Sequence, residues 1–440
     1  MIRPWHALSP FQQVMALWES VRPYNFAHVF RLRGPADAAS LQEAVRAACR
    51  DAGLGVLVLD GRRYRYEPAE DITLGEMEGE DPGLERFWKT VAAEIDRPFP
   101  AGPHHPIRWW VRDDPANASH LFVAVYRHLV ADAAASCLLV GRALRRYYRA
   151  AGDETPLIVH SPDHAVAMAP HYRRGGRLPS LLRAARRFFR LRRVYRLPEA
   201  RDGGEGWGFH VLDSPPGLIG RLVAACRNRG ITVNEAFLAA LCAGLASLTP
   251  RRRGHRSRRG LALAHVVNVR GVAGEDLSRC FGVHLGTSAT VIEEPDAEDF
   301  GALLGRIVRE VRRDKAQLGY AGRDWNFWVL TRLNGWPLIR NTRTWYRKVY
   351  PLSAGVSNFK VDPGWFPGVS DRILDCISIV PPGPALPIVL FPTTVGERLN
   401  VCLVHREACL TGLEAQALAR RFFETLGEFA AYPAREAVPL

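Results

Sequence analysis

The stretch from Val123 to Val140 is the feature that most constrains this chain of 440 residues. Its first residues are apolar, β-branched or aromatic, which is typical of a strand that is buried on both faces of a sheet. From Ala135 onward, apolar residues recur at every third or fourth position, which predicts an amphipathic helix. His128 and Asp132 lie between the two elements. The stretch therefore predicts a buried strand, a turn with two ionisable side chains, and a helix.

A histidine at the end of a buried strand, with free helix N–H groups just beyond it, has the parts of a general base beside an oxyanion site. The pattern His-x-x-x-Asp is weak by itself, because about one chance match is expected in a chain with 14 histidines. The alternative is that His128 hydrogen-bonds a backbone carbonyl in the core, while Asp132 caps the helix. The rest of the sequence has to decide between these interpretations.

Length and composition predict a globular protein with two cores or one large composite core. Apolar residues make up 47% of the chain and aromatic residues 10%, which is typical of folded domains. There is no run of about 18 apolar residues and no apolar core of a signal peptide, so we predict neither a membrane span nor secretion. The eight cysteines have no CxxC spacing and indicate reduced core thiols in a cytoplasmic protein, without a metal site.

The net charge of +14 is concentrated in the ranges 173–201 and 251–259. The second range is predicted to be a solvated loop. The first contains a basic amphipathic helix with an apolar stripe of Leu181, Leu182, Ala185, Phe188 and Phe189, and with Arg183, Arg186, Arg187, Arg190 and Arg193 around the rest. Either this helix contacts an anionic membrane surface, an acidic partner or a nucleotide phosphate, or it packs its stripe on the protein.

Both halves of the chain alternate between helix and strand signals. Thr232 and Glu235 form a capping box before a helix that is apolar nearly all round and is therefore buried. A span rich in Pro, Arg and Gly is the best candidate for a crossover. We predict an N-terminal half at 1–170, a basic crossover at 171–208 and a C-terminal half at 209–440. The expected strands are 27–32, 56–59, 64–66, 107–111, 121–126, 209–212, 261–269, 286–291, 373–381, 388–391 and 399–405. The expected helices begin near residues 11, 40, 84, 133, 233, 300 and 412, and Ser40 is expected to cap the second of them.

Five segments resemble, in order and at sensible spacing, the condensation-domain group of HxxxD acyltransferases. The opening SPFQQ resembles the group's Ser-Pro-x-Gln start, and RHLVADA falls where the group has His-His-x-x-x-Asp-Gly. ITVNEAFLAALCAGL is similar to its buried second-half helix, HVVNVRG to its Asn-x-Arg strand, and VSNFKVDPGW to its Ser-Asn segment. The resemblance covers nearly the whole chain, and it is specific for the superfamily but not for the substrate.

The resemblance implies a mixed α/β fold of two chloramphenicol-acetyltransferase-like halves. Each half would be a mostly mixed sheet flanked by helices, with a tunnel between them and His128 at its middle. It also implies a stand-alone enzyme that moves an acyl group from a thioester to a hydroxyl or amine of a small molecule, in natural-product or lipid biosynthesis. The donor would be acyl-CoA or an acyl- or peptidyl-carrier protein with its phosphopantetheine arm, and no cofactor would be bound. We expect a monomer in the cytoplasm, with peripheral contact to the inner membrane surface left open.

The resemblance also assigns roles to individual residues. His128 would be the general base and Asp132 would hold its loop. The N–H of Ala133, together with Ser357 or Asn358, would bind the oxyanion. A supporting structural role would fall to Arg127, Asn268 and Arg270.

Three positions depart from the family pattern. Arg127 replaces the first motif histidine, Ala133 replaces the motif glycine, and Gly55 stands where an arginine could pair with the motif Asp. Arg270 or Arg127 would then have to pair with Asp132. These departures keep a second hypothesis open, namely a catalytically silent module that recruits a carrier protein or another partner. Nucleic-acid binding is not predicted, because it rests on net charge alone and the chain has no nucleic-acid-binding motif.

Overall fold

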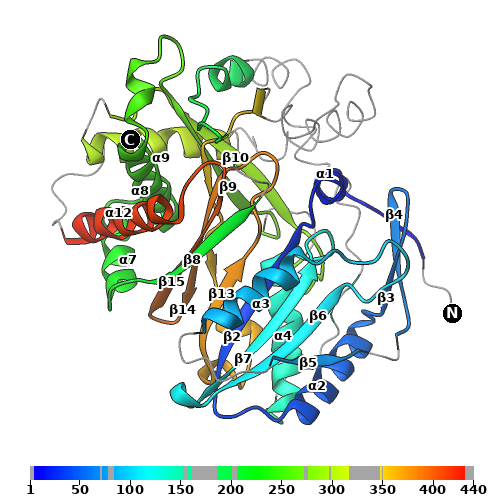
Figure 1. Cartoon of the computed structure of the whole chain (residues 1–440). Coiled ribbons are helices and arrows are strands. Elements are labelled where there is room, and N and C mark those ends of the chain that lie inside the picture. The colour runs from blue at the N-terminus through cyan, green and yellow to red at the C-terminus, as the bar shows by residue number, and fades with distance from the viewer. Residues whose placement is uncertain are drawn as a thin grey trace. The chain divides into compact units, whose positions relative to one another are not determined.

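The computed structural model describes residues 4–69, 72–77, 84–151, 157, 159, 186–200, 206–271, 276–296, 299–316, 347–348 and 350–431. The chain divides into two compact units (Figure 1). Unit 1 consists of Met1–Ala169, Asn268–Leu285 and Lys360–Pro381, and unit 2 consists of Pro170–Val267, Gly286–Phe359 and Pro382–Leu440. The predicted halves were continuous in sequence. In the structure, two segments of the second half belong to unit 1.

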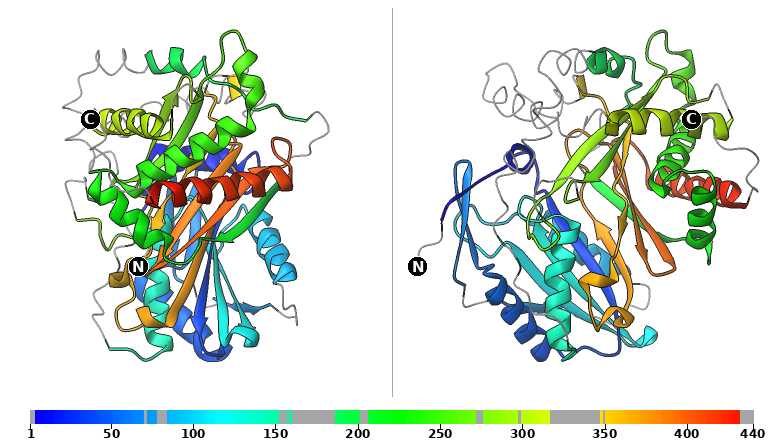
Figure 2. Two further views of the ribbon diagram at one scale, coloured as in Figure 1. Left: turned by 90° about the vertical axis from the view of Figure 1, so that its left-hand side faces the viewer. Right: turned by 180° about the vertical axis from the view of Figure 1, so that it is seen from behind.

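Unit 1 is built on a five-stranded sheet in the order β13-β2-β7-β6-β5. The strands are β13 (Ile373–Ile379), β2 (Asn25–Arg33), β7 (Ser119–Arg127), β6 (Ile107–Asp114) and β5 (Leu74–Glu76). All neighbours are antiparallel except β5 and β6, so the sheet is mixed, as predicted. The helices α2 (Ala38–Ala52) and α4 (Ala133–Tyr147) lie side by side on one face of this sheet, and α3 (Glu85–Asp96) lies on the other face (Figures 1 and 2).

The central strand β7 is buried along almost its whole length, as its apolar sequence predicted. It pairs with β2 on one side and β6 on the other, and helices cover both faces of the sheet. Helix α4 lies close to the short helix η3 (Pro363–Trp365), because Gly141 has no Cβ to meet the Trp365 carbonyl. The strand and helix next to the His-x-x-x-Asp motif are therefore both packed against neighbours: β7 lies between β2 and β6, and α4 lies against η3.

A smaller three-stranded sheet and the first helix complete unit 1. The predicted hairpin is confirmed as β3 (Val56–Asp60) and β4 (Arg63–Glu67), with β1 (His6–Ala7) beside β4. Helix α1 (Pro10–Glu19) begins with a capping box between Ser9 and Gln12. The prediction that Ser40 caps α2 was wrong, because Asp37 is the cap and its carboxylate accepts the Ser40 N–H.

Unit 2 has a seven-stranded mixed sheet in the order β10-β9-β11-β14-β15-β8, with β12 beside β14. Its helices α7 (Leu218–Asn228), α8 (Val233–Leu248), α9 (Phe300–Ala316) and α12 (Gly412–Ala431) gather on one face (Figure 1). The capping box of Thr232 and Glu235 begins α8, and this helix is buried along most of its length, as predicted. The strands are β8 (Trp207–Asp213), β9 (Leu261–Asn268), β10 (Leu285–Ile292), β11 (Ala354–Val356), β12 (Phe359–Lys360), β14 (Ile388–Val395) and β15 (Arg398–Arg406). The remaining short helices are η1 (Pro115–Asn117), η2 (Pro250–Gly254) and η4 (Ser370–Arg372).

Burial matches the expectation for the cysteines, since seven of the eight thiols are buried and only Cys409 is partly accessible. Within the described ranges, no single helix is both long enough and apolar enough to cross a bilayer. Only α7 and α8 taken together reach that threshold, and they are bent by 106° at their junction.

Candidate active site

His128 lies in the turn between β7 and α4, directly after the buried strand. Its backbone N–H donates to the Tyr24 carbonyl over 3.3 Å. Its ring Nδ1 lies 3.2 Å from the carbonyl oxygen of Ala131. A carbonyl oxygen can only accept, so Nδ1 carries the proton and the lone pair of the neutral ring is on Nε2. This places a histidine with one defined basic nitrogen at the end of the central strand.

Two aromatic rings fix the plane of the His128 imidazole. Tyr24 stacks on it with ring centroids 5.3 Å apart and an interplanar angle of 23°. Phe26 meets it edge-on, with centroids 5.2 Å apart and an angle of 69°. Burial lowers the pKa of His128, and the Ala131 carbonyl and the Asp132 charge offset this only in part. The imidazole is therefore neutral at pH 7.

Asp132 is the N-cap of α4 and is only 1% exposed. One carboxylate oxygen accepts the N–H of Ala135 over 2.9 Å. The other accepts from the Arg270 guanidinium over 2.6 Å and from the backbone N–H of His284 over 2.9 Å. Burial raises the pKa of this carboxyl, but the Arg270 charge and these hydrogen bonds outweigh burial, so the net pKa lies below its ordinary value. Asp132 is thus a charged and fully engaged structural group.

Arg270 and Arg127 could each replace the missing partner of Asp132, and in the structure Arg270 makes the ion pair. This residue lies 138 positions along the chain, just beyond β9, in the segment Asn268–Leu285 that belongs to unit 1. The Asn268 side chain accepts the Arg270 backbone N–H over 2.9 Å and so shapes the turn that carries the guanidinium. The same segment, Asn268–Leu285, also contacts the loop that carries Asp132, because the Asp132 N–H donates to the Gly282 carbonyl over 3.2 Å.

Arg127 has a different partner. Its guanidinium makes a two-pronged ion pair with Glu19 at the end of α1, the shortest N···O distance being 2.6 Å. Burial raises the pKa of Glu19 even though Arg127 acts to lower it. Arg127 therefore joins α1 to the end of β7, which is consistent with the supporting role that the resemblance implies.

Two contacts to the motif loop were missed by sequence reasoning. The buried Gln12 side chain donates to the Leu129 carbonyl over 2.8 Å, across 117 positions. The sequence contained a signal for this contact, because Gln12 is the glutamine of the Ser-Pro-x-Gln motif. The His284 contact to Asp132 uses a backbone N–H, and a backbone donor leaves no signal in the residue type.

The predicted oxyanion donors lie in different units. Ala133 is the first residue of α4, and none of the residues that the structure describes accepts a hydrogen bond from its N–H. First-turn N–H groups of a helix point along the axis without intrahelical partners and favour negative charge. Ser357 and Asn358 follow β11 in unit 2, where the Ser357 N–H donates to the Leu390 carbonyl over 2.9 Å. Their part in the reaction stays a prediction, as does the tunnel.

Gly55, the third departure, is required by the fold at its own position. A Cβ there would clash with the Glu67 carbonyl. An arginine could not replace Gly55 without moving the β3–β4 hairpin, and in this chain Arg270 pairs with the motif Asp instead.

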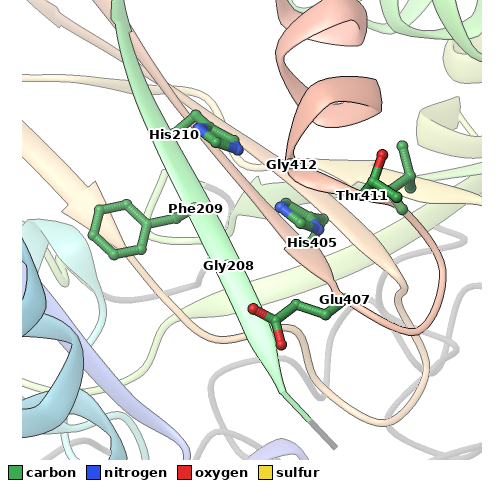
Figure 3. Close-up of a pocket in the computed structure, with 8 residues that line it drawn as sticks. Gly208, Phe209, His210, His405, Glu407, Thr411 and Gly412 are labelled. Carbon is green, nitrogen blue, oxygen red and sulfur yellow. The ribbon is translucent and has the colours of Figure 1, made fainter. Parts of the chain in front are cut away.

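A separate pocket of about 340 Å³ lies in unit 2 between β8, the end of β15 and the start of α12 (Figure 3). The His210 and His405 rings stack there with centroids 5.7 Å apart and an angle of 5°, while Phe209 points to the other side of the strand. Burial lowers the pKa of both histidines. The pocket holds none of the predicted site residues. No metal-binding group of three or more His, Cys, Asp or Glu side chains occurs among the described residues.

This architecture is similar to that of solved structures, although no protein-family model and no curated protein matches the chain. Among solved structures, it is similar to the condensation domain of the Monacolin K polyketide synthase MokA, with a TM-score of 0.68, 15% identity, and 98% of each chain covered. The first condensation domain of the calcium-dependent antibiotic synthetase, in complex with a substrate analogue, gives a TM-score of 0.73 at 19% identity, covering 100% of this chain and 99% of that one.

The X-domain from teicoplanin biosynthesis, solved in complex with OxyB, gives a TM-score of 0.63 at 17% identity, covering 100% of this chain and 96% of that one. These similarities extend over the full length of the chain, although few residues are identical. They confirm the fold predicted from the sequence resemblance. The chain has the two-part, chloramphenicol-acetyltransferase-like fold of the condensation domains.

Proposed function

We propose that this protein transfers an acyl group from a thioester to a hydroxyl or amine of a small molecule, with His128 as the general base. The observation that carries the proposal is the state of the imidazole. Its Nδ1–H is held by the Ala131 carbonyl and its ring is neutral, while the motif Asp is held by Arg270. A neutral and oriented imidazole at the start of a helix has the properties that general-base catalysis requires.

The reaction can be written with atoms and charges balanced. Nε2 of His128 accepts the proton of the acceptor O–H or N–H as the acceptor's lone pair attacks the thioester carbonyl carbon. The carbonyl oxygen becomes an oxyanion. As the tetrahedral intermediate collapses, the C–S bond breaks, and the imidazolium returns its proton to the departing sulfur. The products are an ester or amide and a free thiol, and no acyl-enzyme forms.

The oxyanion would be stabilised by the Ala133 N–H at the first turn of α4, with Ser357 or Asn358 as further donors. A donor of this kind is commonly worth about 3 kcal/mol in the barrier. Asp132 does not take part in proton transfer in this scheme, because both of its oxygens are occupied. It is a positioning residue that holds the turn between His128 and α4 in one shape.

The donor would be a carrier protein with its phosphopantetheine arm, or coenzyme A. The condensation-domain fold supports this choice, since the similar solved domains come from polyketide and nonribosomal peptide synthetases. The net charge of +14 supports it as well, because carrier proteins are acidic and coenzyme A carries phosphates.

The decisive experiment offers a panel of acyl-CoA and acyl-carrier thioesters to mixed alcohols and amines and follows acyl transfer by intact mass. We expect wild-type turnover and a loss of about 10²- to 10⁴-fold in His128→Ala, which is the usual contribution of a general base. The matched control is His120→Gln, because His120 is also buried, lies on β7, the strand that leads to His128, and has its Nδ1 against a carbonyl, that of Gly34. Equal turnover in His128→Ala and wild type would remove His128 as the base.

A second candidate is a silent recruitment module. Two observations favour it: Arg127 and Ala133 depart from the motif, and one similar structure is an X-domain in complex with OxyB. A folded wild-type protein that transfers no acyl group from any donor, but binds a carrier protein with equal affinity in wild type and His128→Ala, would select this candidate over catalysis.

A further inference from the structure

The basic helix turns two of its arginines, Arg187 and Arg190, toward the protein. Residues 186–191 are helical. Arg187 donates to the Ala289 carbonyl over 2.6 Å and lies 3.2 Å from Asp314. Arg190, one turn later, donates to the Val291 carbonyl over 2.8 Å and pairs with Glu310 at 2.9 Å. The inner face of this helix therefore combines these charged contacts with the buried Leu191, which packs in one apolar cluster with Val291.

The free edge of the unit 2 sheet explains this orientation. β10 is the last strand in the sheet order, so its outer edge lacks a neighbouring strand among the described residues. Ala289 and Val291 are two positions apart, so their carbonyls point to the same side of the strand. Guanidinium donors from Arg187 and Arg190 satisfy these two acceptors and protect the edge. The hypothesis that Phe188 and Phe189 pack on the protein was wrong for this reason; the Leu181–Ala185 part of the stripe lies outside the described residues.

As a consequence, two adjacent phenylalanines face outward. Phe188 is 37% exposed and Phe189 is 66% exposed. Their ring centroids are 5.8 Å apart, so they form one apolar contact point. Two touching aromatic rings at the surface offer an apolar group that a partner or a lipid surface could bury.

Cations lie beside this contact point and follow it along the chain. The Arg192 guanidinium lies over the Phe188 ring at 5.7 Å. Arg193 has 69% of its side chain exposed, although its guanidinium lies 3.9 Å from the Glu293 carboxylate. The following backbone pairs with the basic loop, since the Tyr195 N–H donates to the Gly260 carbonyl over 2.8 Å. Burial lowers the pKa of Arg196, and the charges of Arg258, Arg347 and Arg192 lower it further.

We propose that the arginine–phenylalanine face, defined as Phe188, Phe189, Arg192, Arg193, Arg196 and Arg258, docks on the surface of an anionic lipid bilayer. The helix that carries the two phenylalanines is joined to the edge of β10 in unit 2 by Arg187 and Arg190, and Figure 1 labels that strand. The two rings enter the boundary between head groups and acyl chains, while the guanidiniums pair with lipid phosphates. Charge complementarity supports this occupant, because cations beside an apolar point match an anionic lipid surface. The inference is independent of the proposed catalysis.

The first test measures association with phosphatidylcholine vesicles with and without about one third phosphatidylglycerol, a composition chosen to set the surface charge. We expect association with the anionic vesicles only, weakening as salt screens the charges. Arg192→Gln with Arg193→Gln should weaken it roughly 25-fold, from about 1 kcal/mol per arginine near an anionic surface. Phe188→Ser with Phe189→Ser should weaken it by about tenfold or more.

Matched controls come from α12. Leu413 is 77% exposed and Arg420 is exposed, so Leu413→Ser and Arg420→Gln remove comparable groups from another surface. We expect both controls to associate like the wild type, and all variants to keep the wild-type circular dichroism spectrum. Acyl transfer from acyl-CoA to a soluble acceptor should be unchanged in the face variants, which separates this proposal from the proposed function.

A fluorescent reporter identifies the occupant. An environment-sensitive dye on Phe189→Cys, in a Cys409→Ser background that removes the one partly accessible thiol, should shift to the blue on anionic vesicles. The same dye on Leu413→Cys should not shift. The proposal is overturned if folded wild type ignores anionic vesicles, if the phenylalanine variants associate like wild type, or if the dye is already in an apolar environment without lipid. A shift caused by an acidic carrier protein but not by vesicles would assign the face to that protein instead.

Discussion

At the scale of single residues, the site depends on which groups are charged. His128 is neutral because it is buried, and Asp132 stays ionised despite burial because Arg270 and two backbone N–H groups pair with it. A buried charge is tolerated only when it is paired and hydrogen-bonded. In the motif, His128 is therefore neutral and Asp132 is charged. A neutral imidazole is the form that can act as a general base.

The pH dependence of acyl transfer should report His128. Only the neutral ring can accept a proton, so kcat/KM should rise with pH and reach its plateau once His128 is deprotonated. Because burial lowers the His128 pKa, the midpoint should lie below the ordinary histidine value of 6.5. His28 nearby should not contribute, since burial lowers its pKa to about 3. A pH–rate profile at subsaturating substrate measures the midpoint, and a midpoint above 6.5 would contradict the buried neutral state.

At the scale of elements, glycines decide how closely α4 approaches its neighbours. Gly141 lies on α4 against the Trp365 carbonyl, so the helix and η3 are closer than any side chain would allow. Gly427 is also within a helix, α12, but a Cβ at that position would meet no atom within 4 Å. The same residue type therefore has a packing role in one helix and none in the other.

We expect Gly141→Ala to lower the free energy of unfolding by about 1–3 kcal/mol, because the new methyl group forces α4 away from η3. Gly427→Ala should leave stability unchanged or raise it by up to about 1 kcal/mol, since alanine favours helix and the space is open. Urea unfolding followed by circular dichroism measures both. Equal effects of the two substitutions would show that the contact with η3 is not tight.

At the scale of the whole molecule, several arginines that contribute to the charge of +14 have structural partners. Arg252 is fully buried and pairs with Asp296, which also accepts from Arg253. Arg187 and Arg190 are used to cover the edge of β10. These four arginines therefore have structural partners, so the net charge alone does not indicate nucleic-acid binding.

For this reason we expect random-sequence DNA to bind weakly and without sequence preference. Association should fall by about tenfold or more between about 50 and 200 mM salt, as for purely electrostatic contacts. Fluorescence anisotropy with two unrelated duplexes, titrated with salt, measures this. Tight binding of one duplex that survives physiological salt would instead support nucleic-acid recognition.

The sequence by itself determined most of the elements. Periodicity and capping residues placed the β3–β4 hairpin, the start of α8 and the strand–turn–helix around His128, because these signals act over a few neighbouring residues. The five motifs also predicted the fold. For Asp132, the residues narrowed its partner to Arg270 or Arg127 but did not choose between them.

Only the tertiary structure made that choice, because it depends on where distant segments lie. Arg270 meets Asp132 across 138 positions, and β13 pairs with β2 although one was expected in the second half of the chain and the other in the first. Arg187 and Arg190 of the basic helix turned inward because a sheet edge next to it offered two carbonyls. An amphipathic pattern shows that a helix has two faces, whereas the neighbours that the fold supplies decide which face is buried.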